Sequence, residues 1–317
     1  MIAPGSTLGI LGGGQLGRMI GLAARRLGYR LAVLDPDPEC AASSMADHVV
    51  SGGFDDIDAA LRLASLADVV TLEIEKIDNA VLQAVSEKVP LRPGAHVLEV
   101  IRDRGRQRAW LESVSAPVGP WKLATNAMAI EQAASRFGGK CFVKRCVGGY
   151  DGRGQVEIEA PSEAAQAFHD LGQAPVVVEK ALQLDFELSV LGARNPSGQV
   201  VTYAPARNHH EQRILVWSGW PAPLEPELVQ SAQHLARRVA DAIELEGVMV
   251  AEMFVTRDAE LLINELAPRV HNSYHSSERV ADTDQFEQAV RAACDLPIGS
   301  AAANGHAAID YLMGDEW

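Results

Sequence analysis

Residues 250–255 (VAEMFV) and residues 261–269 (LLINELAPR) decide the fold of this chain. Both are apolar runs typical of strands and a short polar turn separates them, so we predict a β-hairpin. Each run carries one acid, Glu252 or Glu265, and directly opposed side chains of a hairpin lie about 5 Å apart. With Asn264 beside the second acid, these oxygen ligands suit Mg²⁺. The simpler alternative, an amphipathic hairpin with solvated acids, stays open on this stretch alone.

The composition is that of a globular protein. The chain has 317 residues, 47% of them hydrophobic and 22% charged, which predicts two or three domains. No apolar run approaches the roughly 20 residues of a membrane span, and residues 1–5 do not resemble a signal peptide, so we expect no membrane attachment. The four cysteines show no zinc spacing, which favours free thiols in a reducing cytoplasm. The net charge of −14 argues against nucleic-acid binding but not against a phosphorylated small molecule.

The first 95 residues alternate between strand and helix patterns. Strands are predicted at 7–11, 30–34 and 68–72, and helices at 15–27 and 57–66. This alternation predicts a parallel sheet with helices on its faces, as in a Rossmann-like domain.

Two turn-rich segments, 91–94 (LRPG) and 116–120 (APVGP), interrupt the chain further on. Between them we predict one charged helix over 95–113. The elements predicted after them are strands at 141–144, 155–158, 176–179, 187–193 and 200–204, helices at 162–170, 226–243 and 284–294, and the hairpin. We therefore expect an N-terminal Rossmann-like domain over 1–94, a linker helix and lid over 95–175, and a catalytic domain with the start of a further domain over 176–317.

The first glycine-rich loop covers residues 12–17 (GGGQLG), which fit the G-x-G-x-x-G pattern between a strand and a helix. Asp35 ends the next strand, so the segment is close to a dinucleotide-binding fingerprint, and a nicotinamide dehydrogenase is a serious alternative. The physics of such a loop is more general, because glycines let backbone amides approach an anion at a helix N-terminus. Another anion is the favoured occupant, and a purely structural turn is the third possibility.

The second glycine-rich loop lies within residues 142–155 (FVKRCVGGYDGRGQ). Its glycines and cations predict a mobile lid that folds over a polyphosphate, although the Walker A order of residues is absent. Two acids follow on strand patterns: Glu179 is suited to an adenine edge and Glu187 to ribose hydroxyls. Ordinary solvated acids are the simpler interpretation of both.

The order of these features resembles the ATP-grasp ligases: a lysine on a strand, a glycine-rich lid, an acid at a strand end, and two acids with an asparagine on a late hairpin. Over essentially the whole chain the resemblance is to the 5-(carboxyamino)imidazole ribonucleotide synthetase family. The motifs that carry it are 11–19 (LGGGQLGRM), 143–145 (VKR) with 148–155 (GGYDGRGQ), and 263–273 (INELAPRVHNS). The implied fold is an α/β ATP-grasp architecture, with a Rossmann-like parallel-sheet domain, a small lid domain and a larger domain with a mixed or antiparallel sheet.

The activity implied by the resemblance is ATP-dependent carboxylation of 5-aminoimidazole ribonucleotide by bicarbonate. The reaction passes through carboxyphosphate and yields N5-carboxyaminoimidazole ribonucleotide, ADP and phosphate in purine biosynthesis. The resemblance to this family also implies that the chain forms a homodimer.

Site residues are carried over from the same resemblance, with ATP and Mg²⁺ as cofactors. The metal ligands would be Glu252 and Glu265. The nucleotide would be held by Arg108, Lys144, Gly149, Glu179, Lys180, Glu187, His210 and Asn264. The acceptor would be bound by Gly14, Gln15, Leu16, Glu73, Tyr150, Asn272 and Ser273. Catalytic roles would fall to Asp151, Arg153, Arg269 and His271.

The chain departs from the family pattern in four places. Arg108 stands where the family has a lysine, and the two are not interchangeable at a phosphate. Tyr274 and Arg213 each replace a glycine, and we expect both to add bulk near the acceptor pocket. Residues 308–317 resemble the start of the family's C-terminal domain, and the basic motif expected to hold the ribonucleotide phosphate does not follow. The alternatives are an ATP-grasp ligase with a different amine acceptor and a non-catalytic nucleotide-binding descendant.

Overall fold

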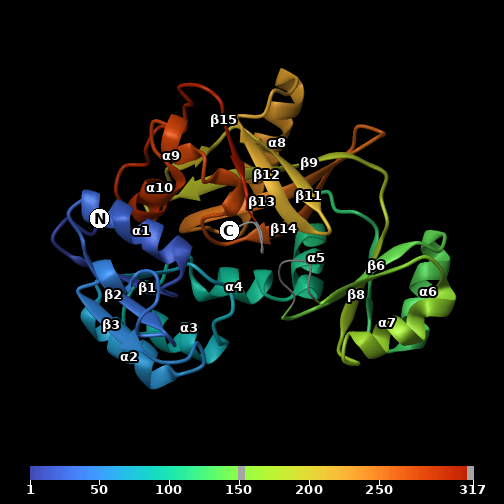
Figure 1. Cartoon of the computed structure of the whole chain (residues 1–317), viewed down its shortest axis with the longest axis horizontal. Coiled ribbons are helices and arrows are strands. Elements are labelled where there is room, and N and C mark those ends of the chain that lie inside the picture. Colours follow the sequence, from blue (N-terminus) through green and yellow to red (C-terminus); the bar gives the residue numbers. More distant parts are fainter. Residues whose placement is uncertain (149–153, 313–317) are drawn as a thin grey trace.

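Three β-sheets organise the chain, and the structure, a computed structural model, describes residues 1–148 and 154–312. Figure 1 shows the N-terminal sheet and a small lid sheet on opposite sides of the molecule, with the largest sheet above and between them. The helices α4 and α5 run between these parts (Figure 1). This arrangement confirms the predicted α/β architecture, with a parallel-sheet N-terminal domain, a small lid sheet and a larger antiparallel sheet.

The N-terminal sheet is fully parallel, as the strand and helix alternation predicted. Its order is β3-β2-β1-β4, from β1 (Thr7–Leu11), β2 (Arg30–Asp35), β3 (His48–Ser51) and β4 (Val69–Leu72). The helices between and after the strands are α1 (Gln15–Arg26), α2 (Ile57–Leu66) and α3 (Asn79–Ser86). Parallel strands end at a common edge, so this sheet gathers the loops that follow β1, β2 and β4.

The linker consists of two helices, α4 (Ala95–Ile101) and α5 (Arg104–Ser113), so the prediction of one helix over 95–113 was wrong. The break has a local cause. Asp103 has an extended backbone, and its side chain accepts a 3.0 Å hydrogen bond from the amide of Arg106, which makes it the N-cap of α5.

The lid sheet is antiparallel in the order β5-β8-β6-β7. Its elements are β5 (Trp121–Ala124), α6 (Ala127–Phe137), β6 (Cys141–Arg145), β7 (Gln155–Ile158), α7 (Ala164–Asp170) and β8 (Val176–Lys180). Strand β8 pairs with both β5 and β6, although we expected a domain boundary before residue 176. We therefore propose that the boundary follows Lys180.

The largest sheet is antiparallel, with the order β14-β13-β9-β11-β12-β15 and β10 paired to β9. Its strands are β9 (Leu184–Arg194), β10 (Val200–Thr202), β11 (Ala206–Glu211), β12 (Ile214–Trp220), β13 (Gly247–Thr256), β14 (Leu261–Ala267) and β15 (Ala307–Asp310). The accompanying helices are α8 (Pro226–Ala242), α9 (Ser277–Val280) and α10 (Gln285–Ala293).

The two faces of β13 have different partners, because successive side chains of a strand point to opposite sides. Met249 and Ala251 belong to the core that includes α8, whereas Val248 and Val250 belong to the core that includes α10. Glu252 lies on the same face as Val248 and Val250, at the point where apolar packing ends and a cavity begins. No helix in the described part of the chain is long and apolar enough to cross a membrane.

Candidate active site

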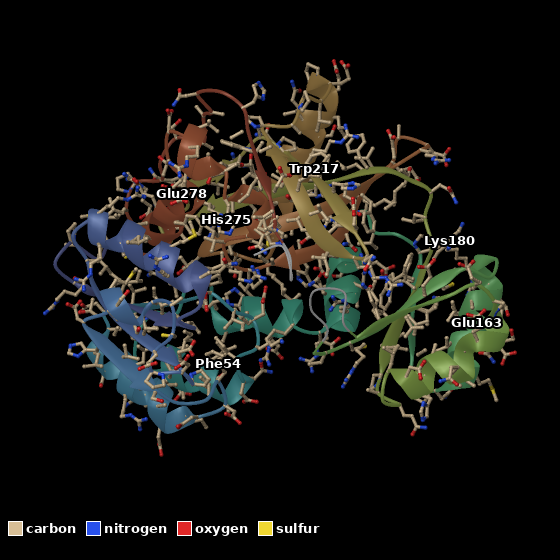
Figure 2. The ribbon with its side chains drawn as sticks, in the orientation of Figure 1. Phe54, Glu163, Lys180, Trp217, His275 and Glu278 are labelled. Atoms are coloured by element: carbon tan, nitrogen blue, oxygen red, sulfur yellow. The ribbon has the colours of Figure 1, made fainter. Side chains whose placement is uncertain are left out.

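A cavity of about 590 Å³ lies between the lid sheet, α5 and the end of the largest sheet. Figure 2 shows Lys180, one of its lining residues, where β8 leaves the lid sheet toward β9. Twelve residues predicted from the sequence line this cavity: Arg108, Lys144, Glu179, Lys180, Glu187, His210, Glu252, Asn264, Glu265, Arg269, His271 and Asn272. The structure thus gathers residues that are up to 164 positions apart in the sequence, Arg108 and Asn272 being the outermost of them.

The predicted hairpin forms with its acids directly opposed, since Glu252 of β13 pairs with Glu265 of β14. The register then shifts, because Met253 pairs with Ile263 and leaves Asn264 as an extra residue in a β-bulge. Neighbouring residues of a regular strand would point to opposite faces. The bulge instead lets Asn264 and Glu265 both line the cavity with Glu252.

Both acids have basic partners within the site. Arg104 Nη2 lies 3.1 Å from Glu265 Oε2, and His271 Nε2 lies 2.9 Å from Glu252 Oε1. Burial works to raise the pKa of Glu252, but the hydrogen bond from His271 and the positive charges around the site outweigh it and hold that pKa below its usual value. Glu252 is therefore ionised at neutral pH, as a metal ligand must be.

A third oxygen, Oδ1 of Asn264, is buried and has no hydrogen-bond partner among the described residues. A buried acceptor without a hydrogen bond costs free energy of folding unless a ligand satisfies it. Within residues 1–148 and 154–312, no three His, Cys, Asp or Glu side chains form a metal-binding group. The donor set is instead two carboxylates and one amide, which suits a hard cation that keeps other ligands from substrate or water.

A buried charged triad joins the lid to the largest sheet. Glu179 of β8 lies 2.7 Å from Lys144 Nζ, and its other oxygen accepts bonds of 2.9 and 2.6 Å from Nε and Nη2 of Arg108. Arg108 also donates a 2.8 Å bond to the carbonyl of Ile263 in β14. Burial alone would raise the pKa of Glu179, but Lys144 and Arg108 hold it at about 2.

Glu187 and His210 meet across the neighbouring strands β9 and β11. His210 Nδ1 lies 3.1 Å from Glu187 Oε2, within ion-pair distance but without hydrogen-bonding geometry. Burial works to lower the pKa of His210, but the carboxylate of Glu187 outweighs burial and the pKa is raised. The pair places an imidazole and a carboxylate on the same wall of the cavity as Glu252.

The first glycine loop holds a carboxyl group of the chain itself, the side chain of Glu73. The amides of Gly14 and Gly17 donate bonds of 2.5 and 2.6 Å to its two oxygens, and Gly13 donates a 2.8 Å bond to Asp35. A Cβ at Gly14 would lie 2.7 Å from the Glu73 carboxylate, so the loop needs glycine to close this tightly. Burial raises the pKa of Glu73 although both amides favour its charged form.

Not every predicted residue reaches the cavity. Gly14, Gln15, Leu16, Glu73 and Ser273 do not line it, and Ser273 is fully buried, which contradicts its predicted contact with the acceptor. The predictions for Gly149, Tyr150, Asp151 and Arg153 lie outside the described residues.

The two glycine replacements behave differently. Tyr274 is fully buried, and its hydroxyl bonds the carbonyls of Ser189 and Ala204, so the expectation that it crowds the acceptor pocket was wrong. Arg213 does line the cavity, and its guanidinium lies 3.3 Å from Glu157 of the lid strand β7.

Sequence reasoning missed four charged residues that line the cavity: Glu75, Lys76, Arg102 and Arg104. Arg104 precedes Arg108 by four positions on α5, so both face the same side of the helix, and this spacing was the available signal. Glu75 lies 2.8 Å from Arg269 Nε, a contact between distant segments that no local pattern indicates.

Two domain families match the chain. The ATP-grasp domain matches residues 109–286, and the ribonucleotide synthetase preATP-grasp domain matches residues 5–102. Among similar proteins, the N5-carboxyaminoimidazole ribonucleotide synthase of Bacillus subtilis is 35% identical over 316 residues, covering 100% of this chain and 83% of its own. That of Brucella melitensis is 35% identical over 317 residues, covering 99% and 88%.

Solved structures agree with these matches. An ADP complex of an N5-carboxyaminoimidazole ribonucleotide synthetase superposes with a TM-score of 0.94 at 37% identity, covering 97% of this chain and 82% of that one. The Aspergillus clavatus synthase, solved with ADP and 5-aminoimidazole ribonucleotide, gives a TM-score of 0.90 at 28% identity and covers 96% and 81%. From its fold, its acid pair and these full-length matches, the chain belongs to the N5-carboxyaminoimidazole ribonucleotide synthase family of ATP-grasp ligases.

Proposed function

We propose that the chain uses ATP and bicarbonate to carboxylate the amine of 5-aminoimidazole ribonucleotide, yielding N5-carboxyaminoimidazole ribonucleotide, ADP and phosphate. The observation that carries this proposal is the convergence of Glu252, Glu265 and Lys144 in one cavity. The reaction comes from the family, and the acceptor is the ribonucleotide bound to the Aspergillus clavatus relative.

The nucleotide would lie between the lid sheet and the hairpin of β13 and β14. Apolar side chains suited to a flat purine line this part of the cavity: Phe142, Leu182, Leu184, Ile214, Leu215, Phe254 and Leu266. We assign Lys144 to the phosphates, Glu179 and Lys180 to the adenine, and Glu187 to the ribose. Phosphoryl transfer needs chiefly such positioning and charge stabilisation, with little covalent chemistry by the protein.

The residues present fit Mg²⁺. Glu252 and Glu265 face each other, and Asn264, whose Oδ1 has no hydrogen-bond partner among the described residues, is the bulge residue directly before Glu265. When bound, the ion would supply positive charge at the oxygens of the transferring phosphate. Arg104 and His271, which contact the two carboxylates, would orient them as outer partners.

Carboxylation would proceed in two steps. A bicarbonate oxygen attacks the γ-phosphate of ATP, giving carboxyphosphate and ADP. The amine nitrogen then takes the carboxyl carbon, loses a proton and releases phosphate. Arg269, held by Glu75 at the cavity wall, provides a fixed cation for these anions, and exclusion of water would protect the carboxyphosphate.

The test is Mg²⁺-dependent ADP release with bicarbonate, measured with and without 5-aminoimidazole ribonucleotide. We expect strong stimulation by the ribonucleotide. ATP cleavage that the ribonucleotide does not stimulate would point to another acceptor, and no cleavage at all would contradict the ligase assignment. Homodimer assembly and a cytoplasmic location remain predictions.

A further inference from the structure

A row of buried polar side chains lies behind His271, on the side away from the cavity. Ser189 of β9, Asn208 of β11, Ser218 of β12 and Ser273 are at most 5% exposed. Strand pairing sets Ser189 directly opposite Glu252 and Asn208 directly opposite Ser218. These side chains therefore share the sheet face that carries the proposed metal ligand.

The row is hydrogen-bonded from end to end. Asn208 Nδ2 lies 3.1 Å from Ser189 Oγ, Ser189 Oγ lies 2.7 Å from Ser273 Oγ, and Ser273 Oγ lies 2.9 Å from His271 Nδ1. On the far side of the imidazole, His271 Nε2 lies 2.9 Å from Glu252 Oε1. Four bonds thus join a buried amide to the carboxylate at the cavity.

The direction of the row follows from one donor that cannot rotate. The backbone amide of Ser273 points its N–H at His271 Nδ1, 3.3 Å away, so this nitrogen is an acceptor. Each hydroxyl has a single proton. Ser273 must therefore donate to His271, which requires Ser189 to donate to Ser273 and Asn208 to donate to Ser189.

The same argument fixes the tautomer of the imidazole. With Nδ1 accepting, the proton of neutral His271 is on Nε2, where it is donated to Glu252. Glu252 thereby receives a directed bond from a ring that is hydrogen-bonded, on its other side, to a row of three buried residues: Ser273, Ser189 and Asn208.

We propose that Ser273, Ser189 and Asn208 are positioning residues that hold the imidazole of His271 in one orientation, with Nε2–H aimed at Glu252. The consequence for catalysis rests on the proposed function, in which Glu252 is a metal ligand. Fully satisfied buried networks are rigid, so this row would preorganise the carboxylate before substrates bind. Ser273 acts through His271 and does not touch substrate.

The chain offers a matched control. Ser276, three residues after Ser273, is also buried at 5% exposure, yet its hydroxyl has no hydrogen-bond partner in the described part of the chain. Ser273→Ala and Ser276→Ala therefore remove the same atom from similar surroundings, and only the first interrupts the row. Ser189→Ala interrupts the row one residue further from His271, at a side chain that does not itself contact the imidazole.

The direct readout is the ¹⁵N NMR spectrum of the imidazole of His271 in the enzyme without metal or substrate. In the wild type and in Ser276→Ala we expect a single neutral tautomer protonated at Nε2. In Ser273→Ala the backbone amide still holds Nδ1 as an acceptor, so we expect the same tautomer with the Nδ1 resonance displaced from its wild-type position by loss of the hydroxyl bond, and a smaller displacement in Ser189→Ala. A spectrum of Ser273→Ala that matches the wild type, or a wild-type imidazole protonated at Nδ1, would overturn the proposal.

Kinetics supply the second readout. We expect Ser273→Ala to lower kcat by roughly tenfold or more, as loss of an outer partner does, while KM for the ribonucleotide stays within about twofold. Ser276→Ala should retain both constants, and equal losses in the two variants would contradict a positioning role. A chain whose variants show the predicted Nδ1 displacements but whose ATP turnover does not respond to the ribonucleotide would refute the proposed function and leave the positioning of His271 intact.

Discussion

Acid should weaken the fold through one buried carboxylate, that of Glu179. Lys144 and Arg108 overcome the effect of burial and hold its pKa at about 2, against an ordinary value of 4.5. Folding lowers the pKa of Glu179, so the ionised carboxylate stabilises the folded state. This stabilisation is complete at pH values above the ordinary pKa and is lost as the pH falls toward 2. The full shift corresponds to about 3 kcal/mol, of which roughly 1–1.5 kcal/mol should disappear between pH 6 and pH 3.5.

The perturbation is Glu179→Gln, which removes the titrating group and leaves Lys144 and Arg108 without a shared carboxylate. At pH 6 the variant should be less stable by about 3–5 kcal/mol, the usual effect of breaking a buried ion pair. As the pH falls to 3.5, the melting temperature of the wild type should fall faster than that of the variant. The gap between them should narrow by roughly 2–5 °C.

The assay is the melting temperature by circular dichroism at half-unit steps of pH, for the wild type, Glu179→Gln and a control. The control is Glu159→Gln, which removes an exposed carboxylate that lies 2.8 Å from Lys140 beside the same sheet. Its melting temperature should follow that of the wild type at every pH. A constant gap between the wild type and Glu179→Gln would refute the reasoning.

Three further substitutions test other parts of the site. Glu265→Gln should lower kcat/KM for ATP by about 100-fold or more while the melting temperature changes little, because it removes one carboxylate charge from the proposed metal site and that site is polar. Retained turnover would refute the metal assignment. Arg108→Lys should preserve ATP binding, measured by calorimetry, but lower the melting temperature by roughly 3–10 °C. The reason is that a lysine cannot bond Glu179 and the carbonyl of Ile263 together, as Arg108 does. An unchanged melting temperature would contradict this structural role of Arg108. Arg213→Gly and Gln212→Gly both place glycine at a left-handed backbone position, with φ of 69° and 49°, but only Arg213→Gly removes a contact with the lid. Only Arg213→Gly should therefore raise KM for ATP, by roughly two- to fivefold. Equal effects of the two variants would argue against a role for that contact.

Local patterns predicted the parts of the fold that local physics determines. The parallel N-terminal sheet followed from alternating strand and helix patterns, and the opposition of Glu252 and Glu265 followed from the hairpin. The bulge at Asn264 did not follow, because a pattern of period two cannot show where one strand carries an extra residue. That one residue determines whether the amide joins the acids.

Contacts between distant segments account for the other differences. The glycine loop was predicted to hold an anion, but its occupant, Glu73, comes from the end of β4, which the parallel pairing of β1 and β4 brings to the same edge. Tyr274 was expected at the pocket because it follows the Asn-Ser motif, yet it packs edge-on against Tyr203 in the core. The break before α5 could have been predicted from the sequence, because aspartate is a common N-cap residue and Asp103 lies inside an otherwise helical pattern.

The most direct test of the central claim is transfer of carbon from ¹³C-bicarbonate to 5-aminoimidazole ribonucleotide, followed by NMR with ATP and Mg²⁺ present. We predict a carbamate carbon on the exocyclic nitrogen, formed in step with ADP and absent when ATP is omitted. ADP formation without any labelled carbamate would contradict the assignment of this chain as the carboxylating enzyme.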